Sequence, residues 1–134
     1  MERHFPENLL YTKEHEWCLV EGDVVTIGIT WHAQDALGDI VYCELPNAGE
    51  PVAAGQPFGV VESVKAVSDL FSPVTGEVLE RNDDIIEAPE DLNDDSYDDG
   101  WMIRVKLKDV GELDGLMSAA DYERSVLPHS AGVL

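Results

Sequence analysis

The sequence is poor in basic residues. Its 134 residues include 8 Lys and Arg against 28 Asp and Glu, which gives a formal net charge of −20. Phosphate backbones and anionic membrane surfaces repel a chain with this charge, so we expect neither nucleic acid nor lipid as a partner. The same charge favours docking on basic patches of other proteins, or the binding of a cationic group.

Cysteines and long apolar runs are also scarce. The two cysteines, Cys18 and Cys43, do not make the disulfide framework of a small secreted domain, and we interpret both as reduced thiols in strands. No apolar run approaches the ~18 residues of a membrane span, and the N-terminus lacks the features of a signal or transit peptide. We therefore expect a cytoplasmic protein, or a mitochondrial-matrix protein in a eukaryote.

The patterns of a metal centre or a nucleophilic enzyme are absent. The two cysteines and four histidines show neither C-x-x-C nor H-x-x-x-H spacing, so the sequence predicts no zinc site. A thiol enzyme would need Cys18 or Cys43 together with His15 or His32 and an acid. Both cysteines fall within expected strands rather than at a turn or a helix start, which disfavours that alternative.

The sequence does contain many short strand patterns. Val25, Ile27 and Ile29 alternate with small or polar residues, which predicts a half-buried strand, and residues 17–20 complete a hairpin across a turn at 21–23. Further strand patterns lie within residues 39–46, 58–63, 67–72 and 101–108. Short strands between Gly- and Pro-rich turns indicate a sandwich or barrel, and the length suits one domain spanning residues 1–134.

Two segments have helical patterns. Thr30 offers an N-cap to a short helix over residues 31–37, which Gly38 can end. A second helix is expected over 113–127, where Ser118 and Asp121 resemble a capping box.

The remaining segments are predicted to be loops. Residues 83–99 contain nine Asp or Glu and no Lys or Arg, which is typical of a solvated loop. We expect an ordered core over residues 9–127, with Pro128 ending the order and 128–134 forming a frayed tail.

One lysine is isolated from all other basic residues. Lys65 is the sole Lys or Arg between Lys13 and Arg81. Strand-like runs meet at it from both sides, so the simplest geometry is a tight turn with Lys65 at an exposed tip. An exposed amine near Glu62 and Asp69 stays protonated, which argues against Schiff-base catalysis and favours an attachment point for a group that another enzyme transfers.

The segment ESVKAVSD around this lysine resembles the lipoyl-attachment motif of the glycine cleavage H-protein family. The resemblance extends over about residues 9 to 127 through YTKEHEW, EGDVVTIGIT, AQDALGDIVYCELP, FGVVESVKAVSDLFSPVTGEV and DDGWMIRVK. Biotin carriers place Met on both sides of the lysine, and lipoyl domains of 2-oxoacid dehydrogenases commonly show Asp-Lys-Ala. Val64 and Ala66 stand where biotin carriers have Met, and Val64 stands where those lipoyl domains have Asp. Both differences favour the H-protein family.

The resemblance implies a mainly β, hybrid barrel-sandwich fold with a short internal helix and C-terminal helices, carrying lipoate in amide linkage on Lys65. The family is a carrier and not an enzyme. It shuttles the aminomethyl group of glycine from a PLP-dependent glycine decarboxylase to a tetrahydrofolate-dependent aminomethyltransferase, and dihydrolipoyl dehydrogenase reoxidises the dithiol. A lipoate ligase or a lipoyl/octanoyl transferase would attach the group, and we expect a monomer.

The resemblance also implies two sets of site residues. The recognition set around Lys65 comprises Glu62, Ser63, Val64, Ala66 and Asp69. The cleft for the loaded arm and its cationic amine comprises Glu14, Glu16, Ile29, Leu37 and Asp69, with Ala66 as a further lining residue. The sequence alone places Glu14 and Glu16 on one face of a strand.

Two positions depart from the family, and two other functions remain open. Trp31 stands where Asp is usual, which removes a charge from the start of the short helix. Ser96 precedes Tyr97 where Pro is common, which predicts a looser acidic loop. A relay that donates lipoate to 2-oxoacid dehydrogenase subunits would use the same motif. A plain acidic interaction module would leave Lys65 unmodified.

Overall fold

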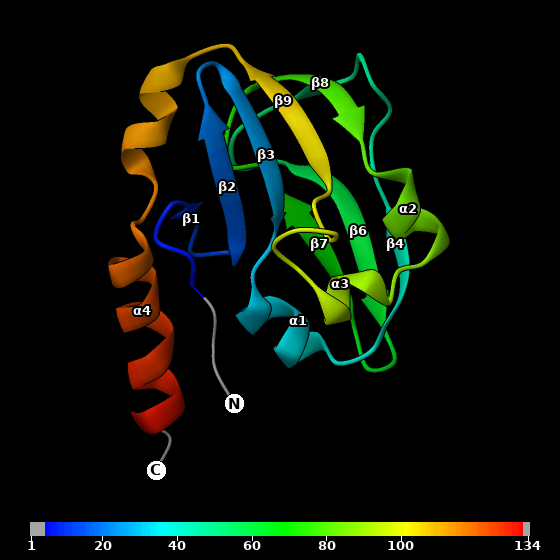
Figure 1. The fold of residues 1–134 in the computed structure, drawn as a ribbon, viewed down its shortest axis with the longest axis vertical. Helices are drawn as coiled ribbons and strands as arrows, with labels where there is room; N and C mark the ends of the chain where they lie inside the picture. The colour runs from blue at the N-terminus through cyan, green and yellow to red at the C-terminus, as the bar shows by residue number, and fades with distance from the viewer. Residues whose placement is uncertain (1–4, 133–134) are drawn as a thin grey trace.

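The computed structural model describes residues 5–132, which form two antiparallel sheets (Figure 1). The six-stranded sheet has the order β1-β2-β3-β9-β8-β5, and the three-stranded sheet has the order β4-β6-β7. The strands are β1 (Leu10–Tyr11), β2 (Glu16–Glu21), β3 (Val24–Ile29), β4 (Ile40–Glu44), β5 (Pro51–Val52), β6 (Pro57–Ser63), β7 (Val67–Phe71), β8 (Gly76–Arg81) and β9 (Ile103–Leu107). The predicted mainly β barrel-sandwich is confirmed, with both sheets open rather than closed into a barrel.

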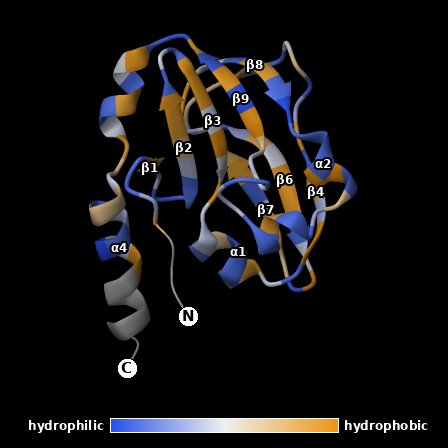
Figure 2. Ribbon diagram, viewed as in Figure 1, coloured by the Kyte–Doolittle hydropathy of each residue, from blue (hydrophilic) through white to orange (hydrophobic). Residues whose placement is uncertain are grey.

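Helical segments connect several of the strands, and the C-terminal helix packs beside β1. They are α1 (Trp31–Leu37), α2 (Asp83–Glu87), α3 (Asp91–Asp94), the 3₁₀ helix η1 (Val110–Gly115) and α4 (Ala119–Gly132). In Figure 1, α4 runs beside β1, while α1 and α3 lie together at the end of the molecule where the β6–β7 hairpin turns. Figure 2 shows the hydrophobic residues concentrated on the strands.

The main core lies between the two sheets. It contains Val25, Ile27 and Val105 from the six-stranded sheet and Val61 and Leu70 from the three-stranded sheet, each at most 2% exposed. A second cluster lies between α4 and the first strands. It includes Tyr122 and Val126 of α4 with Tyr11 and Trp17.

The β2–β3 hairpin forms as predicted, but β3 is buried on both faces rather than half-buried. Gly22 has a φ of 67° in the turn. Thr26 is 4% exposed, and a Cβ on Gly28 would lie 2.6 Å from the indole of Trp17. The Trp17 ring therefore covers Gly28, and this face of β3 is not a solvent face.

The prediction for α1 is confirmed at both ends. The Ala33 N–H donates to Thr30 Oγ1 at 3.2 Å, which caps the first turn. Gly38, with a φ of 80°, ends the helix by donating its N–H to the Gln34 carbonyl at 3.0 Å. This left-handed conformation favours glycine.

The prediction of a solvated loop at 83–99 is wrong. The segment forms α2 and α3, and Ile85 and Leu92 are fully buried in the core. Asn82 caps α2 by accepting a hydrogen bond from the Asp84 N–H at 3.1 Å. The two apolar side chains anchor the segment while most of its carboxylates remain at the surface, so a high charge did not exclude a packed structure.

The helix predicted over 113–127 is interrupted. Met117 pairs with Tyr11 in an isolated β-bridge, so η1 ends before it and α4 starts at Ala119. Ser118 Oγ accepts from the Asp121 N–H at 3.1 Å, as the capping pattern predicted.

Sequence analysis predicted that the ordered chain ends at Pro128. In the structure, α4 continues through Pro128 to Gly132. Proline removes one helical hydrogen bond and commonly bends a helix rather than ending it. The last two residues of the predicted tail lie outside the described residues, so fraying there stays a prediction.

We predict that Gly76→Ala destabilises the fold, because a Cβ at this position would lie 2.0 Å from the Lys106 carbonyl oxygen and 2.7 Å from Val105 Cγ1. Overpacking of this kind should lower the free energy of unfolding by about 3 kcal/mol. Gly115→Ala is the matched control, because a Cβ there meets nothing within 4 Å. Urea midpoints measure both changes, and equal midpoints for the two variants would contradict the close β8–β9 packing.

Candidate functional site

Lys65 lies in the connection between β6 and β7, and Ser63 organises that turn. The Ser63 hydroxyl accepts from the backbone N–H of Lys65 at 3.2 Å and of Ala66 at 3.1 Å. The Ser63 N–H donates to the Ala66 carbonyl at 2.8 Å. These bonds close a turn without Gly, Asn or Asp, because a serine hydroxyl can satisfy the backbone groups of a turn.

The tip also rests on the connection between α1 and β4. The Val64 N–H donates to the Asp39 carbonyl at 3.0 Å. A Cβ on Gly38 would lie 3.0 Å from Lys65 Cε, so the lysine stem passes over this glycine. The predicted exposed tip is confirmed: Lys65 and Ala66 are exposed, and Val64 and Val67 are 69% and 68% exposed.

Lys65 forms no ion pair with another described residue. The ion pairs found within the described residues join Arg81 to Asp83, Arg104 to Glu80, Lys106 to Asp23 and Arg124 to Asp121. None of these pairs includes Lys65.

The outer face of the three-stranded sheet continues from the tip. Strand register places Tyr42, Glu62 and Val67 in one row across β4, β6 and β7. The next row on the same face is Glu44, Val60 and Asp69. Sequence analysis identified Glu62 and Asp69, but it missed Tyr42 and Glu44, because only the β4–β6 pairing brings them to this face.

Glu16 is a buried carboxylate at the other end of β7. It is 2% exposed, and it accepts from the Thr12 hydroxyl at 2.6 Å and from the Phe71 N–H at 3.3 Å. Burial raises the pKa of Glu16 to about 7, although both hydrogen bonds act to lower it. Sequence analysis gave no signal for Phe71, because the contact uses its backbone.

A cavity of about 420 Å³ opens beside this carboxylate. Glu14 and Glu16 line it together with Thr12, Phe71 and Met117. Contrary to the sequence prediction, Glu14 does not share a strand face with Glu16: it lies in the loop before β2. His15 between them has a φ of 74°, which breaks the alternation of a strand.

The other predicted cleft residues, Asp69, Ile29 and Leu37, do not line this cavity. Asp69 is exposed on β7, two residues before Phe71. Ile29 is directly opposite Glu16 across the β2–β3 pairing, and the partly buried Leu37 packs against the same core. Lys65 precedes β7, and Glu16 contacts Phe71 at the other end of that strand.

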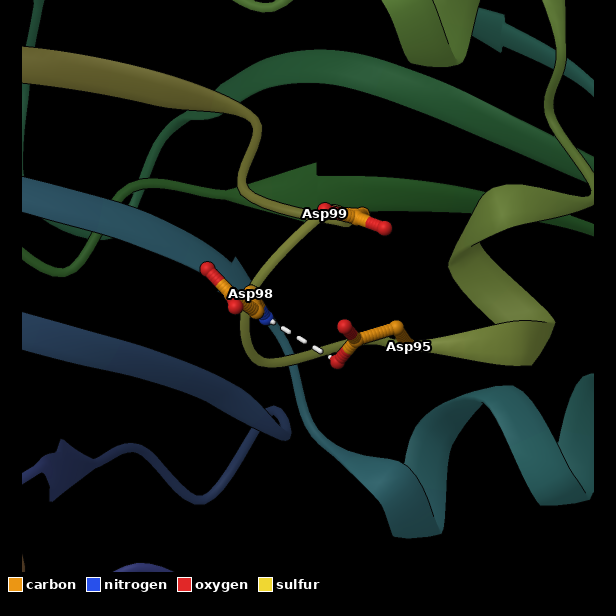
Figure 3. Close-up of side chains that lie close together, drawn as sticks. All are labelled: Asp95, Asp98 and Asp99. Carbon is orange, nitrogen blue, oxygen red and sulfur yellow. Dashed lines mark hydrogen bonds between the residues drawn. The ribbon is translucent and has the colours of Figure 1, made fainter.

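Two further acidic features lie away from this hairpin. Asp95, Asp98 and Asp99 place carboxylate oxygens within 4.8 Å of one another in the α3–β9 loop (Figure 3). The Asp98 N–H donates to Asp95 Oδ1 at 3.2 Å, so the Asp95 side chain stabilises the local turn. Asp98 and Asp99 also line an acidic cavity of about 510 Å³ beside Trp101. Exposed carboxylates commonly gather without an ion, so we assign no metal here.

The two cysteines are buried core residues rather than site residues. Cys18 and Cys43 are free, buried strand residues, and burial raises the pKa of both thiols, that of Cys43 to about 12. Neither thiol is therefore activated as a nucleophile.

The expected loosening at Ser96 is not observed, because Ser96 is buried and its carbonyl accepts from Trp17 Nε1 at 2.9 Å. At Trp31, the backbone N–H donates to the Tyr97 hydroxyl at 3.0 Å, and the first turn of α1 has no acidic residue, as predicted.

Comparisons with known proteins identify the family of this chain. The family model described as glycine cleavage H-protein matches residues 9–129. The chain belongs to the glycine cleavage H-protein family. A glycine cleavage system H protein from Anaeromyxobacter sp. (strain K) is 52% identical over 121 residues, covering 90% of this chain and 94% of that protein. One from Rubrobacter xylanophilus is 53% identical over 119 residues, covering 89% and 92%.

A solved structure shows the same fold. The crystal structure of a glycine cleavage system H protein from Mycobacterium marinum matches with a TM-score of 0.84 at 38% identity, covering 90% of this chain and 98% of that chain. The predicted H-protein family is therefore confirmed. Within residues 5–132, no helix is long and apolar enough to cross a membrane.

We predict that Glu16 makes the stability of this H-protein family member fall as pH rises. Its folded-state pKa of about 7 exceeds the ordinary 4.5, so the folded protein keeps a proton that the unfolded chain releases. This contribution is complete below pH 4.5 and is lost as pH rises through about 7, amounting to about 3 kcal/mol.

Urea unfolding of wild-type protein and Glu16→Gln at pH 5 and pH 8 measures this difference. The Gln variant should lack the decline, and the exposed Glu14→Gln control should keep it. Parallel pH dependences of Glu16→Gln and wild-type protein would contradict the buried carboxylate.

Proposed function

We propose that this chain is the lipoyl carrier of a glycine cleavage system, with lipoate joined through an amide to Lys65. The observation that carries the proposal is the exposed Lys65 tip, distant in sequence from any other Lys or Arg and held by hydrogen bonds to Ser63. Membership of the glycine cleavage H-protein family supports it.

The residues at the tip fit the attached group. The exposed Val64, Ala66 and Val67 leave the lysine open to a modifying enzyme, and Gly38 leaves room for the lysine stem. Bound lipoate would supply a disulfide that accepts the aminomethyl group of glycine and is regenerated by oxidation. The chain presents and shelters this group, and we propose that it catalyses no step itself.

The cleft residues would receive the amine of the cargo, which is cationic at neutral pH. Glu14 and Glu16 offer carboxylates at the cavity, and the exposed Asp69 lies on the strand between the cavity and Lys65. A cation beside Glu16 favours its ionised form, which offsets the desolvation that raises its pKa. The partly buried Leu37 would provide apolar surface for the arm, and Ile29 packs in the core opposite Glu16.

The partners follow from this role. Glycine decarboxylase, aminomethyltransferase and dihydrolipoyl dehydrogenase would each act on the same tethered arm, so local concentration replaces the diffusion of a free intermediate. A lipoate ligase or a lipoyl/octanoyl transferase would modify Lys65. We propose a monomer in the cytoplasm, or in the matrix of a mitochondrion. A lipoate relay would use the same lysine, but the names of the relatives do not favour it.

Lys65→Arg should abolish modification and leave the fold intact, because an exposed substitution of this kind changes stability by less than ~0.5 kcal/mol. The measurement is intact mass after incubation with a lipoate ligase, lipoate and ATP, beside wild-type protein. A gain of one lipoyl group in the wild type alone is the expected result. A gain in the variant would move the attachment site, and no gain in either would leave an unmodified acidic module.

Glu62→Gln and Asp69→Asn should each slow lipoylation by about tenfold in kcat/KM, because both carboxylates share the sheet face beside Lys65 and can meet a basic surface of the modifying enzyme. The exposed Glu21→Gln, in the other sheet, removes the same charge and should leave the rate unchanged. Time courses of intact mass give the rates. Equal slowing by all three variants would indicate a long-range charge effect instead of local recognition.

A further inference from the structure

Tyr122 of α4 is the centre of a buried hydrogen-bond network. Its hydroxyl lies 2.8 Å from His15 Nδ1 and 2.8 Å from Thr30 Oγ1. Tyr122 is fully buried, so its hydroxyl has little access to water as an alternative partner. Two segments far from α4 in sequence therefore share one hydroxyl group.

The His15 arm of the network reaches the cavity. His15 lies between Glu14 and Glu16, both of which line that cavity. Its φ of 74° is a conformation that non-glycine residues rarely adopt, and surrounding contacts must hold it. These contacts include the Tyr122 hydroxyl, a hydrogen bond from the His15 N–H to the Thr12 carbonyl at 3.1 Å, and one from the Thr30 N–H to the His15 carbonyl at 3.0 Å. The His32 ring also packs against His15, with ring centroids 4.8 Å apart.

The Thr30 arm reaches the lysine end. Thr30 Oγ1 caps α1 by accepting from the Ala33 N–H. The helix ends seven residues later at Leu37, and the next residue, Gly38, is the one over which the Lys65 stem passes. A shift of Thr30 would therefore move the support under the tip together with the predicted lining residue Leu37.

The Tyr122 ring is itself fixed. It stacks on Tyr11 with ring centroids 4.8 Å apart and an interplanar angle of 9°. Phe5 meets it edge-on at 5.4 Å. Because the ring is held on these sides, the hydroxyl can act as a fixed point for both segments.

We propose that Tyr122 is a positioning residue for the arm site: its hydroxyl sets the His15 turn that presents Glu14 and Glu16, and the start of the helix that supports Lys65. This inference rests on the proposed carrier function. It assigns α4, which contains none of the predicted site residues, a role in holding the cargo sheltered. The hydroxyl removes only positional freedom and takes part in no bond-changing step.

The test compares Tyr122→Phe with Tyr11→Phe. Both variants remove one buried hydroxyl from the same stacked pair, but the Tyr11 hydroxyl donates to the Pro6 carbonyl and lies outside the network. In the unmodified protein, hydrogen exchange at the Thr30 and Phe71 amides should accelerate about tenfold in Tyr122→Phe and stay near wild type in Tyr11→Phe. These amides report the His15 turn and the Glu16 contact.

The second readout uses the lipoylated protein loaded from glycine by glycine decarboxylase. Formaldehyde release should be about fivefold faster in Tyr122→Phe than in Tyr11→Phe, while the rate of lipoylation stays unchanged. Equal values of exchange and release in the two variants would overturn the proposal. Failure of wild-type Lys65 to accept lipoate would instead refute the carrier function, and the exchange measurement would still decide whether Tyr122 holds the two segments.

A second pair of variants covers the case in which Tyr122→Phe does not fold. Asn tolerates a positive φ and has an amide oxygen where His15 has Nδ1. His15→Asn should therefore keep slow exchange at Thr30 and Phe71, whereas His15→Ala should reproduce the acceleration expected of Tyr122→Phe. The same exchange rates in both His15 variants would overturn the network as the positioning element.

Discussion

The carboxylate of Glu16 joins the two sheets at the point where the rest of the site is built. Glu16 begins β2 in the six-stranded sheet, and one of its oxygens accepts from the backbone of Phe71, the last residue of β7 in the three-stranded sheet. The other oxygen accepts from Thr12 in the preceding loop. A buried acid costs stability where it is ionised, and an apolar residue would avoid that cost. An acid at this position is therefore better explained by the adjacent cavity than by a contribution to folding.

Strand β7 connects the Glu16 contact to the turn that carries Lys65. Phe71 fixes one end of β7 against Glu16, and the turn that carries Lys65 precedes the other end. The turn is held separately by Ser63 within the hairpin and by Asp39 from the α1–β4 connection. The backbone at the tip is therefore held by hydrogen bonds on two sides while the side chain remains exposed. This combination suits a group that must be presented in one place and still reach several active sites.

Local chemistry made much of this structure predictable, and tertiary pairing set the limits. The cap at Thr30, the glycine end at Gly38 and the hairpin tip at Lys65 follow from residues close in sequence, and each was predicted. Tyr42 is placed beside Glu62 by strand pairing, and Phe71 contacts Glu16 through its backbone N–H. Neither contact can be recognised from a sequence pattern. The acidic segment was misassigned because its charge obscured two apolar anchors, Ile85 and Leu92, seven residues apart.

In a chain with a net charge of −20, the charge of Lys65 affects which partner surfaces the tip attracts. An amide at Nζ would remove the positive charge of Lys65, the sole Lys or Arg between Lys13 and Arg81 in the sequence. The carboxylates of Glu44, Glu62 and Asp69 would remain on the neighbouring sheet face. On the proposed function, the modifying enzyme therefore meets a tip with a cation among carboxylates, while later partners meet a purely acidic tip with an apolar arm. Basic surfaces attract the second state more strongly, which would favour release of the modifying enzyme once its reaction is complete and engagement of the enzymes that use the arm.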